Sequence, residues 1–198
     1  MPTRIDPWKQ AEVKDYGKIM RDFGIERFGD LLPRIKDPSI YMRRGVIFGH
    51  RDFGKIVDCM NGGKPFVMMT GLMPSGKFHL GHKMLADEFI YLQKHGGRLY
   101  VCVADVEAYN MRGGSLEELR KTAVEEYLTN YIALGLEPRN CDFYFQSERS
   151  EDAEKSNAFH RMLGIVSKRV TMNEMKAIYG DLSPGKIISV LTLSLIHI

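Results

Sequence analysis

The sequence predicts an α/β fold that contains a parallel β-sheet. Three short apolar runs, each long enough for one buried strand, alternate with segments in which apolar residues recur at helical spacing. The runs are Phe66–Thr70, Arg98–Asp105 and Cys141–Phe145. Strands that alternate with helices are joined by right-handed crossovers, which make neighbouring strands parallel. The second run is almost wholly apolar, as expected for a strand buried on both faces.

The segment before the first strand predicts an extension of mixed α and β structure. Residues 16–28 and 31–38 predict two short helices that glycine and proline interrupt. Residues 41–53 carry several basic side chains and predict a strand or hairpin, and a short helix follows at 55–60. Trp8 is the only tryptophan and follows an Asp-Pro turn, so we expect it to pin the N-terminal segment onto the body.

The helices between and after the strands carry recognisable start signals. A helix is expected from Gly81 to His95, directly after the first strand and its turn. Capping boxes, in which Ser or Thr is followed three residues later by Glu, start at Ser115 and Thr171. The first of these predicts a helix that ends near Gly135, and a further helix should open at residues 150–151.

Composition restricts the class of protein more than its function. The net charge of +3 over 198 residues is too small to indicate nucleic-acid binding by itself. The three cysteines are scattered and form no Cys-x-x-Cys pair, which suits a reducing compartment and gives no zinc site. No segment has the apolar length of a signal peptide core or a membrane helix. We therefore expect a cytoplasmic protein without a membrane span.

The stretch from Thr70 to His82 is the centre of the predicted chemistry. It reads as the end of a buried strand, a glycine-containing turn and the start of a helix, and such a helix start binds anions, commonly phosphate. Gly71, Gly76 and Lys77 match the spacing of a P-loop. However, Phe78 stands where that motif needs the Ser or Thr hydroxyl that binds magnesium, which argues against a P-loop.

The two histidines of this stretch admit three other interpretations. A metal site is weakly supported, because His79 and His82 have no third ligand nearby, and no protein-bound metal is predicted. As a nucleotide site, His-x-Gly-His would place imidazoles against the charge that develops on an α-phosphate, with Gly81 allowing the purine to approach the backbone. A pair of histidines that only cap a helix remains the alternative. The position between strand and helix favours the nucleotide site.

Residues 74–82, Pro-Ser-Gly-x-x-His-x-Gly-His, resemble the HIGH-type signature of class I aminoacyl-tRNA synthetases in its tyrosyl and tryptophanyl form. Residues 5–8, 43–52 and 170–176 are similar to the archaeal and eukaryotic tryptophanyl branch. The resemblance extends from about Ile5 to Thr192. It implies the first half of a Rossmann-like parallel-sheet nucleotide-binding domain behind an N-terminal extension.

The resemblance also implies an activity. The family activates tryptophan with ATP, accompanied by Mg²⁺, to tryptophanyl-adenylate and transfers the amino acid to tRNA(Trp). A homodimer is implied for the full-length enzyme. The tyrosyl branch, another His-x-Gly-His nucleotidyltransferase and a non-catalytic nucleotide-binding fragment remain the alternatives.

Individual residues take roles from the same resemblance. The turn beside ATP comprises Thr70, Gly71, Ser75, His79, Gly81 and His82, of which His79 and His82 are the catalytic pair. Glu107 matches a carboxylate that holds the ammonium group of the amino acid, with Asp105 as the second candidate, and a solvated acid is the alternative for either. Gln146 is expected to face the amino acid. Arg43–Arg51 would cover the ATP side or form a solvated hairpin.

The chain departs from the family in two respects. Met69 and Cys102 occupy positions at which the eukaryotic enzymes carry polar side chains that touch the indole. The Lys-Met-Ser-Lys-Ser loop, which stabilises the leaving pyrophosphate, is absent. We therefore expect a C-terminally truncated and poorly active chain, with an extension at 1–64, half a catalytic domain at 65–194 and a non-native end at 195–198.

Overall fold

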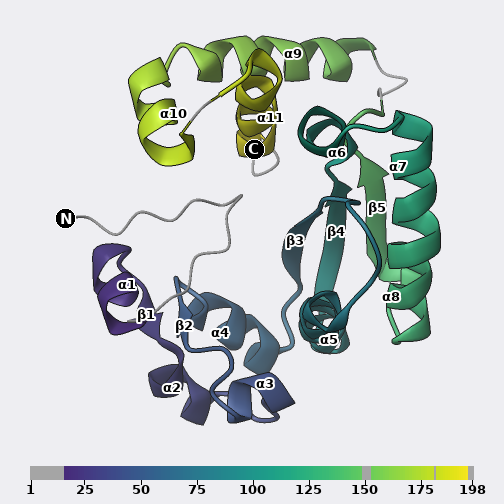
Figure 1. Cartoon of the computed structure of the whole chain (residues 1–198). Helices are drawn as coiled ribbons and strands as arrows, with labels where there is room; N and C mark the ends of the chain where they lie inside the picture. Colours follow the sequence, from purple (N-terminus) through teal and green to yellow (C-terminus); the bar gives the residue numbers. More distant parts are fainter. Residues whose placement is uncertain (1–15, 149–152, 181, 196–198) are drawn as a thin grey trace.

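The centre of the structure is a parallel sheet of three strands in the order β3 (Phe66–Leu72), β4 (Gly97–Val103) and β5 (Cys141–Phe145), shown in Figure 1. The computed structural model describes residues 16–148, 153–180 and 182–195. Thr70 lies beside Val101, and Val101 lies beside Phe143, so the three strands run in register. The predicted α/β fold with a parallel sheet is confirmed.

One face of the sheet is covered by helices. These are α5 (Leu80–Lys94), α7 (Leu116–Thr122), the π-helical stretch η2 (Ala123–Leu128) and α8 (Thr129–Ala133). A short 3₁₀ turn, η3 (Pro138–Asn140), then leads into β5. The core between sheet and helices contains the buried side chains Leu72, Phe89, Ile90, Leu99, Val101, Val103, Tyr127 and Tyr131.

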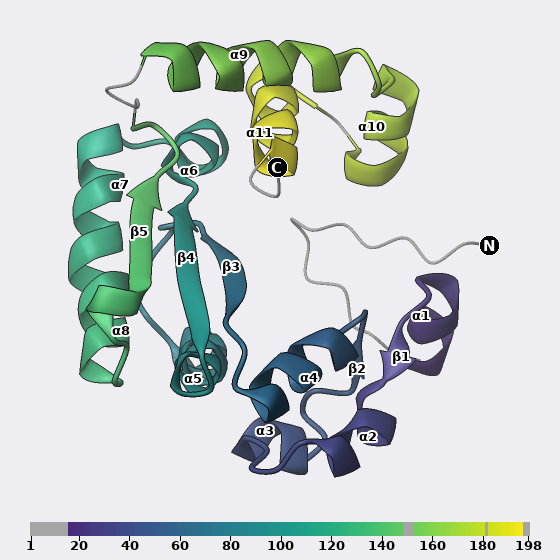
Figure 2. The same ribbon diagram turned by 180° about the vertical axis from the view of Figure 1, so that it is seen from behind.

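The opposite face of the sheet has no helix in front of it in the described part of the chain, as Figure 2 shows from behind. Because side chains alternate along a strand, the odd-numbered β4 residues Leu99, Val101 and Val103 face the helical core, and Cys102 faces the other side. Val67 on the edge strand β3 is 63% exposed on that open face. This face is thus exposed at the edge strand β3, whereas Cys102 on the central strand β4 is buried.

A helical layer lies beyond the carboxyl ends of the strands (Figure 1). It comprises α6 (Asp105–Arg112), α9 (Ala153–Ser167), α10 (Met172–Tyr179) and α11 (Pro184–Leu195). Helix α11 is fixed to α6 because the Asn110 amide donates to the Ser189 hydroxyl at 3.0 Å. Ser189 is fully buried, and a side chain at Gly185 would run into Asn110 at 3.1 Å. The close approach of α11 to α6 thus favours glycine there, because a larger residue would make the Asn110 side chain shift.

The N-terminal extension forms a second hydrophobic cluster of its own. Its elements are α1 (Tyr16–Asp22), β1 (Glu26–Arg27), α2 (Phe28–Leu31), η1 (Leu32–Arg34), α3 (Ile40–Arg43), β2 (Gly49–His50) and α4 (Gly54–Gly62). The cluster contains Phe28, Leu31, Ile35, Met42 and Val57. It is joined to α5 by hydrogen bonds that Tyr41 donates to Asp87 at 2.7 Å and Ser39 donates to Glu88.

Two local predictions were correct only in part. Residues 41–53 do not form a hairpin, because Ser39 caps a helix over their first part by accepting the Met42 N–H at 3.2 Å. The only strand in this segment is Gly49–His50, and its antiparallel partner is Glu26–Arg27. Asp105 does not end β4 but opens α6, where its carboxylate accepts the N–H of Val106 at 3.0 Å.

Other local predictions are confirmed. The capping boxes at Ser115 and Thr171 both form, with Glu118 and Glu174 returning the bond to the cap backbone. The residues from Leu116 to Ala133 are helical throughout, although the middle of the stretch is a π-helix. The expected role of Trp8 and the helix start at 150–151 lie outside the described residues. In the parts that the structure covers, no helix is long and apolar enough to cross a membrane.

The start of β4 provides a test of the packing. A Cβ at Gly97 would lie 2.7 Å from Met68, 2.8 Å from Phe66 and 3.0 Å from the Leu92 carbonyl oxygen. Gly97→Ala should therefore lower the free energy of unfolding by about 1–3 kcal/mol, the usual cost of overpacking. Urea denaturation measures this change. Gly164→Ala in α9 is the control, since nothing lies within 4 Å of the added carbon, and it should be neutral or stabilising. Equal stability of the two variants would contradict the packing described.

Candidate functional site

The histidine turn is built by the first residues of α5. His79 is the N-cap, and its Nδ1 accepts the N–H of Gly81 at 3.1 Å. In return, Nδ1 of His82 accepts the N–H of His79 at 3.3 Å. The two rings stack with centroids 3.7 Å apart. A Cβ on Gly81 would lie 3.1 Å from the His79 ring, so glycine here makes room for that imidazole.

The capping bonds decide which ring nitrogens remain for a ligand. An imidazole nitrogen that accepts a hydrogen bond carries no proton, so in each ring the proton lies on Nε2. His79 and His82 therefore present two Nε2–H donors from stacked rings at the N-terminus of a helix. The helix dipole adds positive potential at the same place. This arrangement is suited to an anion such as a phosphate group.

Aromatic side chains surround the inner histidine. The ring of Tyr127 meets His82 edge-on at 4.9 Å, and Phe78 lies 5.6 Å from it. Burial lowers the pKa of His82 below its usual value, and the neighbouring His79 lowers it further. His82 is thus held as neutral imidazole at neutral pH, in the form that donates through Nε2 alone.

The turn is anchored to the π-helical stretch. Lys77 pairs with Glu126 at 2.6 Å, and this pair holds the pKa of the Glu126 carboxyl below its usual range. The backbone of Ser75 bonds to the Tyr127 side chain. Lys77 is therefore engaged by a carboxylate of the same chain, which agrees with the rejection of a P-loop.

A second group of candidate residues lies across the strands. Gly71, Cys102 and Tyr144 are neighbours in register on β3, β4 and β5. A Cβ at Gly71 would meet nothing within 4 Å, so space is open above this point of β3. Burial raises the pKa of the Cys102 thiol, and the neighbouring Tyr144 hydroxyl acts in the opposite direction. Thr70 precedes Gly71 and is half-buried.

The predicted acids occupy the first turn of α6, where both are buried. Asp105 is fully buried and Glu107 is 8% exposed. One Asp105 oxygen accepts the N–H groups of Val106 and Ser147, each at 3.0 Å, and the other accepts the Ser147 hydroxyl. Asp105 is thus engaged by the end of β5.

Gln146 is the residue of this group whose polar atoms lack partners. Its backbone N–H continues the sheet by donating to Val103 O at 2.8 Å. Its side-chain Oε1 and Nε2 are both buried without a hydrogen bond. Leaving a buried polar group unpaired costs about 1–3 kcal/mol, so an orphaned amide calls for an explanation. A ligand with both donor and acceptor groups would supply one.

The structure divides the predicted site residues into two groups. His79, Gly81, His82 and Ser75 belong to the turn against η2, and Asp105, Glu107 and Gln146 lie together where β4 and β5 end. Two tyrosines that the sequence did not single out adjoin these groups: Tyr127 meets His82, and Tyr144 lies beside Cys102. Each is a tyrosine within an otherwise apolar helix or strand pattern, and its hydroxyl was the feature that could have marked it as a site residue.

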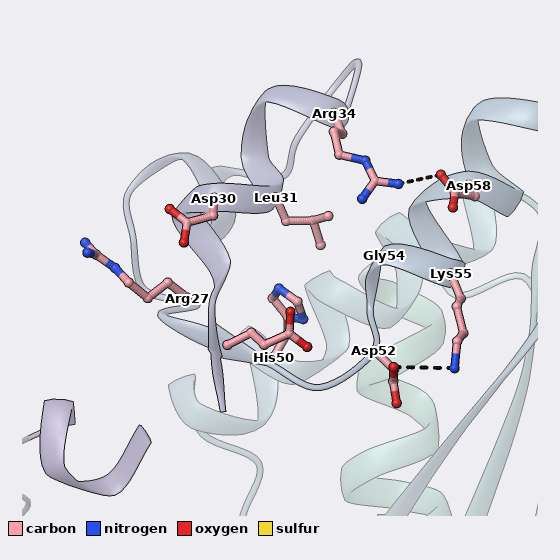
Figure 3. A pocket seen from close by; sticks show the side chains of 10 residues that line it. Arg27, Asp30, Leu31, Arg34, His50, Asp52, Gly54, Lys55 and Asp58 are labelled. Carbon is pink, nitrogen blue, oxygen red and sulfur yellow. Dashed lines mark hydrogen bonds and ion pairs between the residues drawn. The ribbon is translucent and has the colours of Figure 1, made fainter. Parts of the chain in front are cut away.

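Two hollows adjoin these elements. One of about 440 Å³ lies beside the turn, lined by Phe78, His79, Leu80, Lys83, Asn130, Ala133 and Leu134. The other, of about 390 Å³, lies in the extension and is shown in Figure 3. Two ion pairs lie in its lining, Arg34–Asp58 at 2.6 Å and Lys55–Asp52 at 3.4 Å. Among the residues with a described structure, no group of three or more His, Cys, Asp or Glu side chains could hold a metal ion.

Comparison with known proteins defines the class. Residues 60–194 match the family of tRNA synthetases class I (W and Y), and the chain belongs to this family. The resemblance inferred from the His-x-Gly-His signature is thereby confirmed.

The similarity to particular members is to archaeal tryptophan–tRNA ligases. The chain is 47% identical over 193 residues to that of Aeropyrum pernix, covering 96% of this chain and 50% of the relative. It is 44% identical over 194 residues to that of Hyperthermus butylicus, with the same coverages. The crystal structure of the Aeropyrum pernix K1 tryptophanyl-tRNA synthetase superposes with a TM-score of 0.82 at 45% identity, covering 97% of this chain and 52% of that one. The chain spans about half the length of the curated relatives it matches.

The stacked rings give a testable pKa coupling. Because His79 contributes to the lowered pKa of His82, His79→Asn should raise the His82 pKa toward its usual value without restoring it, since burial remains. Histidine Cε1–H shifts followed by NMR against pH would measure this. A His82 pKa that stayed fixed or fell in the variant would contradict the coupling.

The same lowered pKa sets a direction for stability. The unfolded chain binds a proton at His82 more readily than the folded chain does, so this group makes stability fall as the pH drops through its unfolded value of about 6.5. His82→Gln should make the free energy of unfolding depend less on pH. Urea denaturation from roughly pH 7.5 to 5, which brackets the unfolded value, measures this dependence. An unchanged dependence would contradict the assignment.

Proposed function

We propose that this chain provides the ATP- and tryptophan-binding half of a tryptophan–tRNA ligase. The observation that carries the proposal is the stacked His79–His82 pair, which caps α5 and keeps two Nε2–H donors for a phosphate. The similarity to archaeal tryptophan–tRNA ligases supports the choice of amino acid.

In the proposed reaction the tryptophan carboxylate attacks the α-phosphorus of ATP. The new bond joins a carboxylate oxygen to that phosphorus, and the bond to the β-phosphate oxygen breaks to release pyrophosphate. His79 and His82 stabilise the negative charge on the α-phosphate oxygens by donating from Nε2. Thr70, Gly71 and Ser75 shape the turn beside the nucleotide. Mg²⁺ enters with ATP as part of the substrate and neutralises phosphate charge.

The amino acid is assigned to the carboxyl ends of β4 and β5. Glu107, which is buried in the first turn of α6, holds the ammonium group, as the family resemblance implies. The orphaned Gln146 amide faces a polar group of the same substrate. The open space above Gly71 receives the side chain, beside Cys102 and Tyr144, which are its neighbours in register, rather than the polar residues of the eukaryotic enzymes.

The remaining features are proposed on the same basis. The 1–64 segment acts as an extension to a catalytic half-domain that begins at residue 65, and the two clusters of buried residues support this division. The whole protein would bind tRNA(Trp) and form a homodimer, as the resemblance implies, and would work in the cytoplasm, as its composition predicts.

Exchange of radiolabelled pyrophosphate into ATP tests the amino acid. These 198 residues contain no Lys-Met-Ser-Lys-Ser loop, so exchange by the chain alone should be about 10²–10³-fold below that of the Aeropyrum pernix enzyme, the usual cost of losing a transition-state donor. A chimera that adds the second half of that enzyme should recover exchange with tryptophan and not with tyrosine. Tyrosine-dependent exchange, or full activity of the 198-residue chain, would overturn this.

The ammonium site can be tested separately by binding. Glu107→Gln removes the negative charge while keeping the shape, and should raise the Kd for L-tryptophan by about 10–100-fold, as expected for a hydrogen bond to a charged group. Calorimetric titration measures it. Glu117→Gln, on the exposed face of α7, is the matched control and should leave the Kd unchanged. Equal effects of both variants would remove Glu107 from the site.

A further inference from the structure

We infer that Asp105 and Arg120 act as positioning residues that hold the Gln146 amide ready for the substrate. This inference rests on the proposed function for the identity of the ligand, and on the structure alone for the positioning. It assigns roles to a buried carboxylate that the proposed chemistry does not use and to an arginine that the sequence did not single out.

The two residues flanking Gln146 are both fixed by side chains from other elements. Ser147 is held by Asp105, which accepts both its N–H and its hydroxyl. Phe145 is covered by the Arg120 guanidinium, whose carbon lies 4.8 Å from the ring centroid. Between them, the Gln146 backbone is bonded to Val103. Gln146 therefore has little backbone freedom.

Arg120 completes a connected network of charge and hydrogen bonds. Its Nε lies 3.6 Å from Asp105 Oδ2, and its Nη2 donates to the Ser147 hydroxyl at 3.1 Å. The same nitrogen lies 3.8 Å from Glu148. A buried side-chain network in which each carboxylate oxygen and hydroxyl has a partner makes its surroundings rigid.

The contrast with Gln146 indicates what this network is for. The side-chain polar atoms of Asp105 and Ser147 are all hydrogen-bonded, whereas both polar atoms of the Gln146 side chain are buried and unpaired. A free amide in a mobile loop could turn to water, but the clamp on both neighbours keeps it in place. One oxygen acceptor and one NH₂ donor match a zwitterionic amino acid, which carries both an ammonium and a carboxylate.

The test is a double-mutant cycle on binding of L-tryptophan, using the 198-residue chain. Arg120→Met and Gln146→Ala should each raise the Kd, Arg120→Met by about tenfold. In the Gln146→Ala background Arg120→Met should add no further loss. In the unmodified background Arg120→Lys should bind tryptophan more tightly than Arg120→Met does, because it keeps the positive charge. A purely structural arginine would weaken binding equally in both backgrounds, which would overturn the inference.

The chain contains a matched control. Arg98 also pairs with a carboxylate, Asp142 at 2.9 Å, and also lies over an aromatic ring, Tyr100 at 5.5 Å. It does so at the other end of β4 and β5. Arg98→Met should leave tryptophan binding unchanged, and a loss equal to that of Arg120→Met would show a general effect on the sheet and overturn the inference.

A second measurement needs no ligand. The Gln146 side-chain NH₂ should show a high heteronuclear NOE in the unmodified chain and in Arg98→Met, and a reduced one in Arg120→Met. An unchanged NOE in Arg120→Met would overturn the positioning role. If the unmodified chain bound no tryptophan while this pattern held, the proposed function would fail and the positioning role would stand.

Discussion

Strand β4 has a hydrogen-bonded neighbour on each side, and the positions of all the candidate site residues depend on that arrangement. Its alternate side chains Leu99, Val101 and Val103 are fully buried against α5, η2 and α8, which fixes the register of the sheet. Parallel strands in register end at the same edge, so the residues that follow β4 and β5 are brought together although they are about 40 positions apart. Packing on one face of the sheet thereby determines which side chains meet at the carboxyl ends of its strands.

The start of α5 shows how one set of side chains can serve both folding and ligand binding. A helix N-terminus needs acceptors for its free N–H groups, and here the Nδ1 atoms of His79 and His82 supply them in place of the usual hydroxyl or carboxylate. The capping role and the proposed phosphate-binding role use opposite nitrogens of the same rings. The two interpretations of these histidines, a helix-capping pair and a phosphate-binding pair, are therefore compatible.

Local signals in the sequence predicted what depends on local physics. The three strands, the capping boxes at Ser115 and Thr171 and the strand–turn–helix around His79 all follow from apolar runs and short-range hydrogen bonding. The supposed hairpin at 41–53 failed because its one strand pairs with Glu26–Arg27, a partner that no pattern within the segment reveals. The contacts of Arg120 could not be predicted for the same reason, since its partners Asp105 and Ser147 are distant in sequence. The roles of the predicted site residues remain predictions.

The π-helical stretch Ala123–Leu128 keeps the buried side chains of its helix on one side. The buried residues Leu119, Ala123, Tyr127 and Tyr131 recur at every fourth position. In an α-helix of 3.6 residues per turn, each such step would rotate the stripe by about 40° and carry the last tyrosine off the sheet. The wider π-turns absorb that rotation. The stretch is the equivalent of one inserted residue, and it keeps Tyr127 against His82 and Tyr131 against Phe89 on a single straight seam.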